Sequence, residues 1–258
     1  MNWAALDWSI LGPALVAGLL VLATHVPLGM EVLDRGIVFI DLAIAQIAGL
    51  GVIVAMSIGL PESGLWTQAA AVIAALLGAM LLTWTERRAP REQEALIGVL
   101  FVLASCIGIV LLAGNPHGGE HLKDLLVGQI LWVNTTQLAW LAGITAILLV
   151  AIHGGVVQRL GRFGFYGVFA VAVTASVQLV GVYLVFSSLI VPALATRFGG
   201  SKRRLLVAYS IGAIGYALGL ALSALFDLPS GAIVVCTLAA IGTLYAVVSP
   251  SRARETSS

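Results

Sequence analysis

The stretch GIVFIDLAIAQIAGLG, residues 36–51, is almost entirely apolar, yet it contains Asp41 and Gln46. Its composition is apolar enough for it to lie in a lipid bilayer. A carboxylate at the centre of a bilayer costs about 2.5–3.5 kcal/mol on insertion scales. The stretch therefore predicts a membrane protein and raises the question of what Asp41 does inside it.

The composition of the whole chain supports a membrane protein. Of its 258 residues, 60% are hydrophobic and 10% are charged, and the mean hydropathy is +1.07. Soluble domains carry about 25% charged residues. The net charge of +1 gives no indication of a nucleic-acid partner. Cys106 and Cys236 lie in apolar runs, so we expect small buried hydrophobic side chains and no disulfide.

Nine apolar segments follow one another along the chain. Because runs this long do not alternate with period two, they predict helices and not a membrane barrel. We expect an all-α integral membrane protein, a polytopic bundle of eight or nine transmembrane helices that forms one permease domain over residues 1–258. The sixth and seventh segments are shorter than the roughly 20 residues of a full span, so we expect broken or tilted helices there. The segments are residues 9–29, 37–59, 66–85, 94–114, 137–156, 163–177, 180–197, 205–225 and 230–248.

The basic residues predict an orientation in the membrane. With the N-terminus outside and the C-terminus in the cytoplasm, 12 of the 13 basic residues fall in inner loops or the tail, and only Lys123 is outside. Cytoplasmic loops of membrane proteins carry such an excess of Lys and Arg. The first ten residues contain Asp7 and no basic residue, so we expect a retained span there and not a cleaved leader.

No polar stretch of the chain is long enough to fold as a soluble domain. The sequence also has no GxxxxGK[ST] phosphate-binding loop. Any ATP-driven work therefore requires a separate subunit.

Polar residues inside the first two segments predict a cation path. His25, Glu31, Asp41 and Gln46 lie in or beside apolar runs, where buried acids and histidine are ligands for a divalent ion. Pro27 should loosen its helix and expose carbonyl oxygens as further ligands. The alternative is a set of hydrogen bonds between helices, with Arg35 paired to Asp34 or to Asp41.

A second polar cluster, NPHGGEH at residues 115–121, lies on the outer side by this topology. His117, Glu120 and His121 could bind metal at an outer entrance, or they could simply belong to a solvated loop. The sequence HGGEH also matches the zinc-protease pattern H-x-x-E-H. We reject that chemistry because the glycine pair opposes the helix that it needs.

Several stretches resemble the membrane subunits of bacterial ABC importers for zinc and manganese. Residues 36–51 resemble the family's Gly-Asp-x-Leu-Ala-His-Ala box, and VGQILWVNTTQL resembles its outer short-helix segment. Two later segments of the family also have counterparts here. One resembles ASVQLVGVYLVFSSLIVPALATR, which includes Pro192, Thr196 and Arg197. The other resembles SALFDLPSGAIVVCTLA, which includes Asp227, Pro229 and Gly231. The similarity runs over nearly the whole chain in the same order.

The resemblance implies a function, a metal path and partners. Asp41 matches the acid of the box, and Gln46 stands where the family has histidine. The expected substrate is Zn²⁺ first, with Mn²⁺ or iron as alternatives, and no permanently bound cofactor is expected. The implied partners are a second copy of the chain, a cytosolic ATPase and a periplasmic or extracellular metal-binding protein, around a permease in a bacterial inner membrane.

One departure from the family leaves an alternative open. The stretch VVQRLGRFG, near residues 156–164, is far shorter than the inner loop whose short helix docks on the ATPase in the family. We expect it to be too short for such a helix, so Lys202, Arg203 and Arg204, or the ERRAPREQE loop, become candidate ATPase contacts. The alternative is a metal channel or carrier that works without an ATPase. A membrane protease is a distant third hypothesis.

Overall fold

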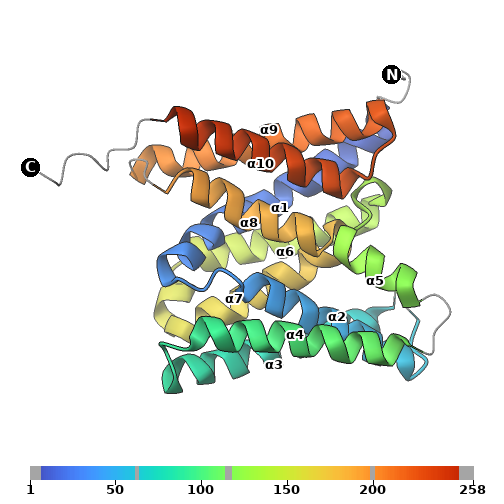
Figure 1. Cartoon of the computed structure of the whole chain (residues 1–258), viewed down its shortest axis with the longest axis vertical. Coiled ribbons are helices and arrows are strands. Elements are labelled where there is room, and N and C mark those ends of the chain that lie inside the picture. Colours follow the sequence, from blue (N-terminus) through green and yellow to red (C-terminus); the bar gives the residue numbers. More distant parts are fainter. Residues whose placement is uncertain (1–6, 62–63, 114–117, 198–200, 250–258) are drawn as a thin grey trace, which may run out of the picture. The chain divides into compact units, whose positions relative to one another are not determined.

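A computed structural model describes residues 7–61, 64–113, 118–197 and 201–249 of the chain (Figure 1). All regular elements within these ranges are helices, which confirms the all-α prediction. The elements are α1 (Trp8–Arg35), α2 (Ile40–Ser57), α3 (Leu65–Arg88), α4 (Gln93–Leu112), α5 (Gly118–Val127), η2 (Ile130–Trp132), α6 (Thr135–His153), α7 (Val156–Val180), α8 (Val182–Ala195), α9 (Ser201–Phe226) and α10 (Ser230–Val248).

Eight of the described helices are long and apolar enough to cross a membrane, and α8 is a shorter apolar helix. The prediction of eight or nine helices is therefore confirmed. The expectation of a short sixth segment is wrong, because residues 159–180 of α7 form a candidate span of 22 residues. The break falls later than expected, at Gly181, which separates α7 from α8.

The chain forms two compact units, each built from segments that are distant in sequence. The first unit comprises residues 1–35, 129–145 and 183–258, and the second comprises residues 36–128 and 146–182. The prediction of one permease domain over residues 1–258 stays a prediction.

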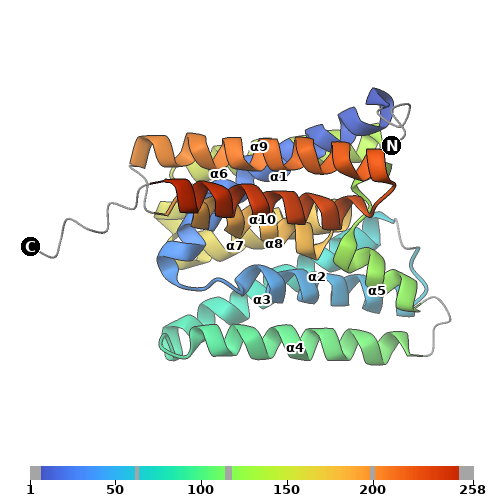
Figure 2. The same cartoon turned by 45° about the horizontal axis from the view of Figure 1, so that its top comes forward.

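In the first unit, α1 and α10 both pack against α9 (Figures 1 and 2). Small residues bring these helices close together: Gly18 of α1 faces the buried ring of Tyr216, and Gly215 of α9 faces Leu238. Since lipid tails are as apolar as leucine, helices in a bilayer associate through close packing of this kind. The glycines of α9 thus serve helix packing.

In the second unit, α2 packs against α3 and α4, and both α2 and α3 pack against α7. The end of α5 meets the end of α7 at Gly128 and Gly181, which have φ angles of 72° and 82°. A Cβ atom on either glycine would overlap the backbone of the other segment. Both positions therefore require glycine, for the left-handed backbone and for the close approach.

The two cysteines correct a prediction. Cys106 on α4 and Cys236 on α10 are free thiols, as expected, but both are exposed on the surface of the fold. An apolar run does not predict burial against protein in a membrane helix, because the faces turned toward lipid are apolar too.

Candidate functional site

Asp41 lies in the first turn of α2 and is completely buried. Neither of its carboxylate oxygens has a hydrogen-bond partner among the described residues. The N-terminus of a helix carries a partial positive charge, which favours a carboxylate in the first turn. This dipole only partly offsets the cost of burying an unpaired acid, so the site can gain free energy by binding a cation.

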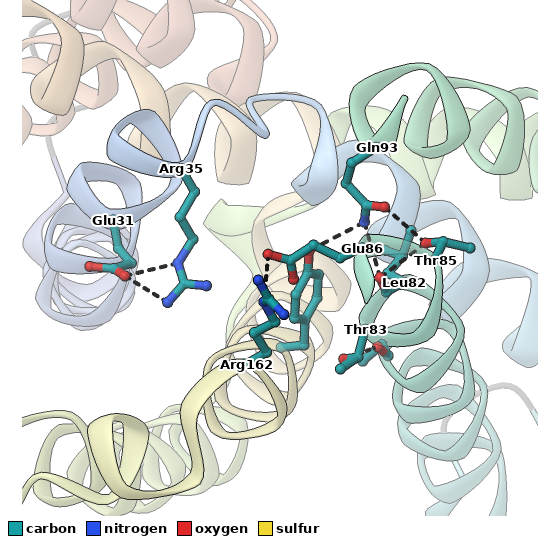
Figure 3. A network of polar contacts seen from close by, with 10 residues as sticks. Glu31, Arg35, Leu82, Thr83, Thr85, Glu86, Gln93 and Arg162 are labelled. Carbon is teal, nitrogen blue, oxygen red and sulfur yellow. Dashed lines mark hydrogen bonds and ion pairs between the residues drawn. The ribbon is translucent and has the colours of Figure 1, made fainter. Parts of the chain in front are cut away.

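Arg35 forms its ion pair with Glu31 (Figure 3). The Nε and Nη2 atoms of Arg35 both lie 2.8 Å from the Oε1 atom of Glu31, one helical turn earlier on α1. The sequence had suggested Asp34 or Asp41 as the partner. A pair spaced by four residues on one helix face is stabilising, whereas adjacent residues point in different directions.

Glu31 is the most accessible acid of the predicted path, with 47% of its side chain exposed. Its carboxylate is also engaged by a guanidinium. It is therefore less suited than Asp41 to hold a metal ion at bilayer depth, although its assignment as a ligand stays a prediction.

His25 on α1 is buried and has a defined tautomer. Its Nδ1 atom lies 2.9 Å from the carbonyl oxygen of Val21 and 3.1 Å from the hydroxyl of Thr24. Because a carbonyl only accepts hydrogen bonds, Nδ1 carries the proton and Nε2 carries a lone pair. Nε2 is buried and has no partner among the described atoms. Metal-binding histidines have this arrangement, in which one ring nitrogen bonds a carbonyl and the other binds the ion.

Pro27 does not open α1 as the sequence suggested. The helix continues through it to Arg35. Proline has no N–H, so the carbonyl of Ala23 loses its helical donor, but the hydroxyl of Tyr209 donates to this oxygen at 3.0 Å. The expected carbonyl ligand is thus already engaged by a protein donor.

Gln46 lies on α2 and is half-buried. It follows Asp41 by five residues, which turns it about 140° away around the helix. The acid and histidine of the family box are four residues apart and share a face. Ala45 occupies that face here, so the match of Gln46 to the histidine of the box is wrong by one position. Gln46 does not point alongside Asp41, and its role as a ligand stays a prediction.

The four residues of the predicted path come from two helices. His25 and Glu31 lie on α1 in the first unit, and Asp41 and Gln46 lie on α2 in the second. Within the described ranges, no group of three or more His, Cys, Asp or Glu side chains is arranged to hold a metal ion.

The outer cluster is only partly described. His117 lies outside the described residues, Glu120 is exposed in the first turn of α5, and His121 follows it on the same helix. The expectation that the glycine pair excludes a helix is wrong, because α5 begins at Gly118. A Cβ atom at Gly118 would lie 2.6 Å from the carbonyl oxygen of Leu112, so close packing explains a glycine at this helix start.

The stretch that we expect to be too short for a coupling helix contains one short helical turn. Residues 156–160 at the start of α7 are helical, and Gly161, with φ 59° and ψ −131°, separates them from the rest of α7. The turn presents Arg159 and Leu160 on the surface, and 60% of Leu160 is exposed. The other predicted ATPase contact consists of Lys202, Arg203 and Arg204. These residues lie at the start of α9, and Arg203 is exposed.

Sequence reasoning missed a buried polar network in the second unit. The amide of Gln93 bonds Thr85, the carbonyl of Leu82 and the hydroxyl of Tyr166 (Figure 3). The signal that could have revealed it is an amide next to a carboxylate, Gln93 and Glu94, at the start of an apolar span.

These features define a class of protein: a polytopic helical membrane protein without a nucleotide-binding loop, in which an acid inside a span has no partner among the described residues. The sequence profile of the ABC 3 transport family matches residues 7–153 and 151–249. The chain belongs to this family of membrane permeases.

Known relatives cover nearly the whole chain. The manganese transport system membrane protein MntC of Halalkalibacterium halodurans is 26% identical over 96% of this chain and 90% of its own length. The high-affinity zinc uptake system membrane protein ZnuB of Haemophilus influenzae is 25% identical over 89% of this chain and 94% of its own. The solved structure of PsaBC from Streptococcus pneumoniae in complex with Fab has the same fold, with a TM-score of 0.75 at 21% identity over 94% of this chain and 93% of that one.

Proposed function

We propose that this chain is the membrane permease subunit of an ABC importer for a divalent transition metal, with zinc as the first candidate and manganese or iron as the others. The observation that carries the proposal is Asp41, a buried carboxylate without a partner among the described residues, in a chain of the ABC 3 transport family. A passing cation accounts for an acid in an apolar span.

Asp41 is the central acid of the proposed path, and His25, Glu31 and Gln46 are candidate further ligands. The imidazole of His25 favours zinc, whereas the amide oxygen of Gln46 is a harder ligand that suits manganese. Relatives named for manganese and for zinc are 26% and 25% identical to this chain, so the choice of metal depends on measurement. His117, Glu120 and His121 are proposed as an outer entrance for the metal.

The proposed importer contains two copies of this chain, a cytosolic ATPase and an external metal-binding protein. The chain itself is not an enzyme in this scheme, and ATP hydrolysis belongs to the partner. The N-terminus lies outside and the C-terminus inside a bacterial inner membrane in this proposal. This orientation is favoured because it places 12 of the 13 basic residues on the cytoplasmic side.

Two inner segments are candidates for the ATPase contact: the short helix at residues 156–160, and Lys202, Arg203 and Arg204 at the start of α9. The exposed helix at residues 156–160 favours the importer over a carrier without an ATPase, because the carrier hypothesis rested on the lack of a docking helix.

Uptake of radioactive zinc or manganese tests the proposal. Cells that lack their own importers would express the chain with its metal-binding protein and either the active ATPase or a variant that cannot hydrolyse ATP. We expect uptake only with the active ATPase. Equal uptake with the inactive ATPase would instead establish the carrier, and no uptake of zinc, manganese or, in the same assay, iron in any combination would overturn metal transport.

A further inference from the structure

Three contacts tie the inner end of α7 to the turn between α3 and α4 in the second unit. The Nε atom of Arg162 lies 3.1 Å from the Oε1 atom of Glu86 (Figure 3). The guanidinium of Arg87 stacks over the ring of Phe163 at 4.6 Å from its centre. Tyr166, one turn further along α7, accepts a 3.3 Å hydrogen bond from Nε2 of Gln93.

Gln93, the first residue of α4, is held by three hydrogen bonds. Its side-chain oxygen accepts a hydrogen bond from the hydroxyl of Thr85 at 2.9 Å, and its Nε2 also donates to the carbonyl of Leu82 at 3.0 Å. Both Gln93 and Thr85 are buried. A buried amide held by three hydrogen bonds has little freedom, so a shift of Tyr166 is transmitted to the start of α4.

The next residue, Glu94, connects the start of α4 to the helix that carries Asp41. Its Oε1 atom accepts a 3.3 Å hydrogen bond from the backbone N–H of Phe39. Phe39 is the N-cap residue of α2, and Asp41 follows it by two positions. Because the first N–H groups of a helix have no partner within it, this carboxylate caps α2 from a neighbouring helix.

We propose that Gln93 and Glu94 are positioning residues that fix the N-terminus of α2, and with it Asp41, to the inner end of α7. This inference rests on the proposed function, because the inner end of α7 begins with the helix proposed to dock on the ATPase. A displacement there reaches Asp41 through Arg162, Tyr166, Gln93 and Glu94, all within one unit of the fold.

The test measures metal ions transported per ATP hydrolysed. Full-length chain, ATPase and metal-binding protein would be reconstituted in liposomes and supplied with Zn²⁺ or Mn²⁺. We expect Tyr166→Phe and Glu94→Ala to lower this ratio by about 5-fold or more, the low end of typical coupling between sites. ATP hydrolysis should continue at the wild-type rate, because these residues contact neither nucleotide nor metal in the proposed mechanism.

Two variants control for structural effects. Glu94→Gln keeps an oxygen that accepts from Phe39, so it should retain the wild-type ratio. Tyr216→Phe also removes the hydroxyl of a buried tyrosine, but this hydroxyl bonds Ser188 in the first unit. It should therefore leave the number of metal ions transported per ATP unchanged.

Three outcomes would overturn the inference. The first is an unchanged ratio in Tyr166→Phe and Glu94→Ala. The second is a parallel fall of uptake, hydrolysis and folded protein, which indicates a merely structural role. The third is a wild-type protein whose uptake does not depend on ATP, which overturns the proposed function together with this inference and is recognised from the wild type alone.

Discussion

The hydroxyl of Tyr209 on α9 donates a 3.0 Å hydrogen bond to the carbonyl oxygen of Ala23 on α1. Ala23 precedes Pro27 by four residues, so this is the carbonyl that the proline leaves without a donor. A hydrogen bond between two helices replaces the one missing within α1. Helix α1 can therefore continue past Pro27 to its end at Arg35.

Tyr209→Phe should lower the free energy of unfolding in detergent by about 0.5–1.5 kcal/mol, because a partly buried carbonyl loses its donor. Tyr183→Phe, at a half-exposed ring on α8, should have no effect. Pro27→Ala restores the donor within α1, so Tyr209→Phe should cost less in that background. An equal cost in both backgrounds would contradict this explanation of the contact.

Asp41→Asn should abolish metal uptake and leave the amount of folded protein unchanged. The substitution keeps the shape of the side chain and removes an unpaired buried charge, so thermal stability should stay the same or rise. Asp34→Asn removes an exposed acid at the C-terminal end of α1 and serves as the control. Normal uptake per folded molecule in Asp41→Asn would remove Asp41 from the metal path.

His25→Gln should reduce zinc uptake more than manganese uptake, because imidazole is a preferred ligand of zinc. His153→Gln is a matched control: His153 also bonds a carbonyl four residues earlier, at 3.0 Å from Leu149, but it is exposed. Competition between the two metals for uptake would measure the effect. An equal loss for both metals would argue for a packing role of His25.

Leu160→Asp should weaken binding of the ATPase, because it places a charge on the most exposed apolar side chain of the short inner helix. Arg203→Glu tests the second candidate contact. Copurification of the ATPase with each variant, and its stimulation by the metal-loaded binding protein, would distinguish them. If both variants retain full stimulation, the ATPase docks elsewhere, for example on the loop around residues 86–94, or does not dock at all.

Cysteines at positions 134 and 159 should react with an impermeant reagent from opposite sides of the membrane. The proposed topology puts Asn134 outside and Arg159 inside, and both side chains are exposed. Cys106 and Cys236 would first be replaced by alanine, since both thiols are exposed in the structure. Labelling of both positions from the same side would refute the orientation.

The sequence by itself determined the class of protein and nearly all of its helices. Hydropathy is a local property, so a long apolar run predicts a membrane helix without knowledge of its neighbours. The same reasoning singled out Asp41, because the cost of an acid in an apolar span does not depend on the rest of the fold.

Only the tertiary structure decided which groups meet. The sequence did not show that Arg35 pairs with Glu31, or that Tyr209 supplies the donor that Pro27 lacks. It also gave the wrong burial for Cys106, because a uniformly apolar helix does not reveal which face meets protein and which meets lipid. Polar partners such as Gln93 and Tyr166, 73 positions apart, are brought together by helix packing, and that packing is set by the fit of small side chains between helices and not by local hydropathy.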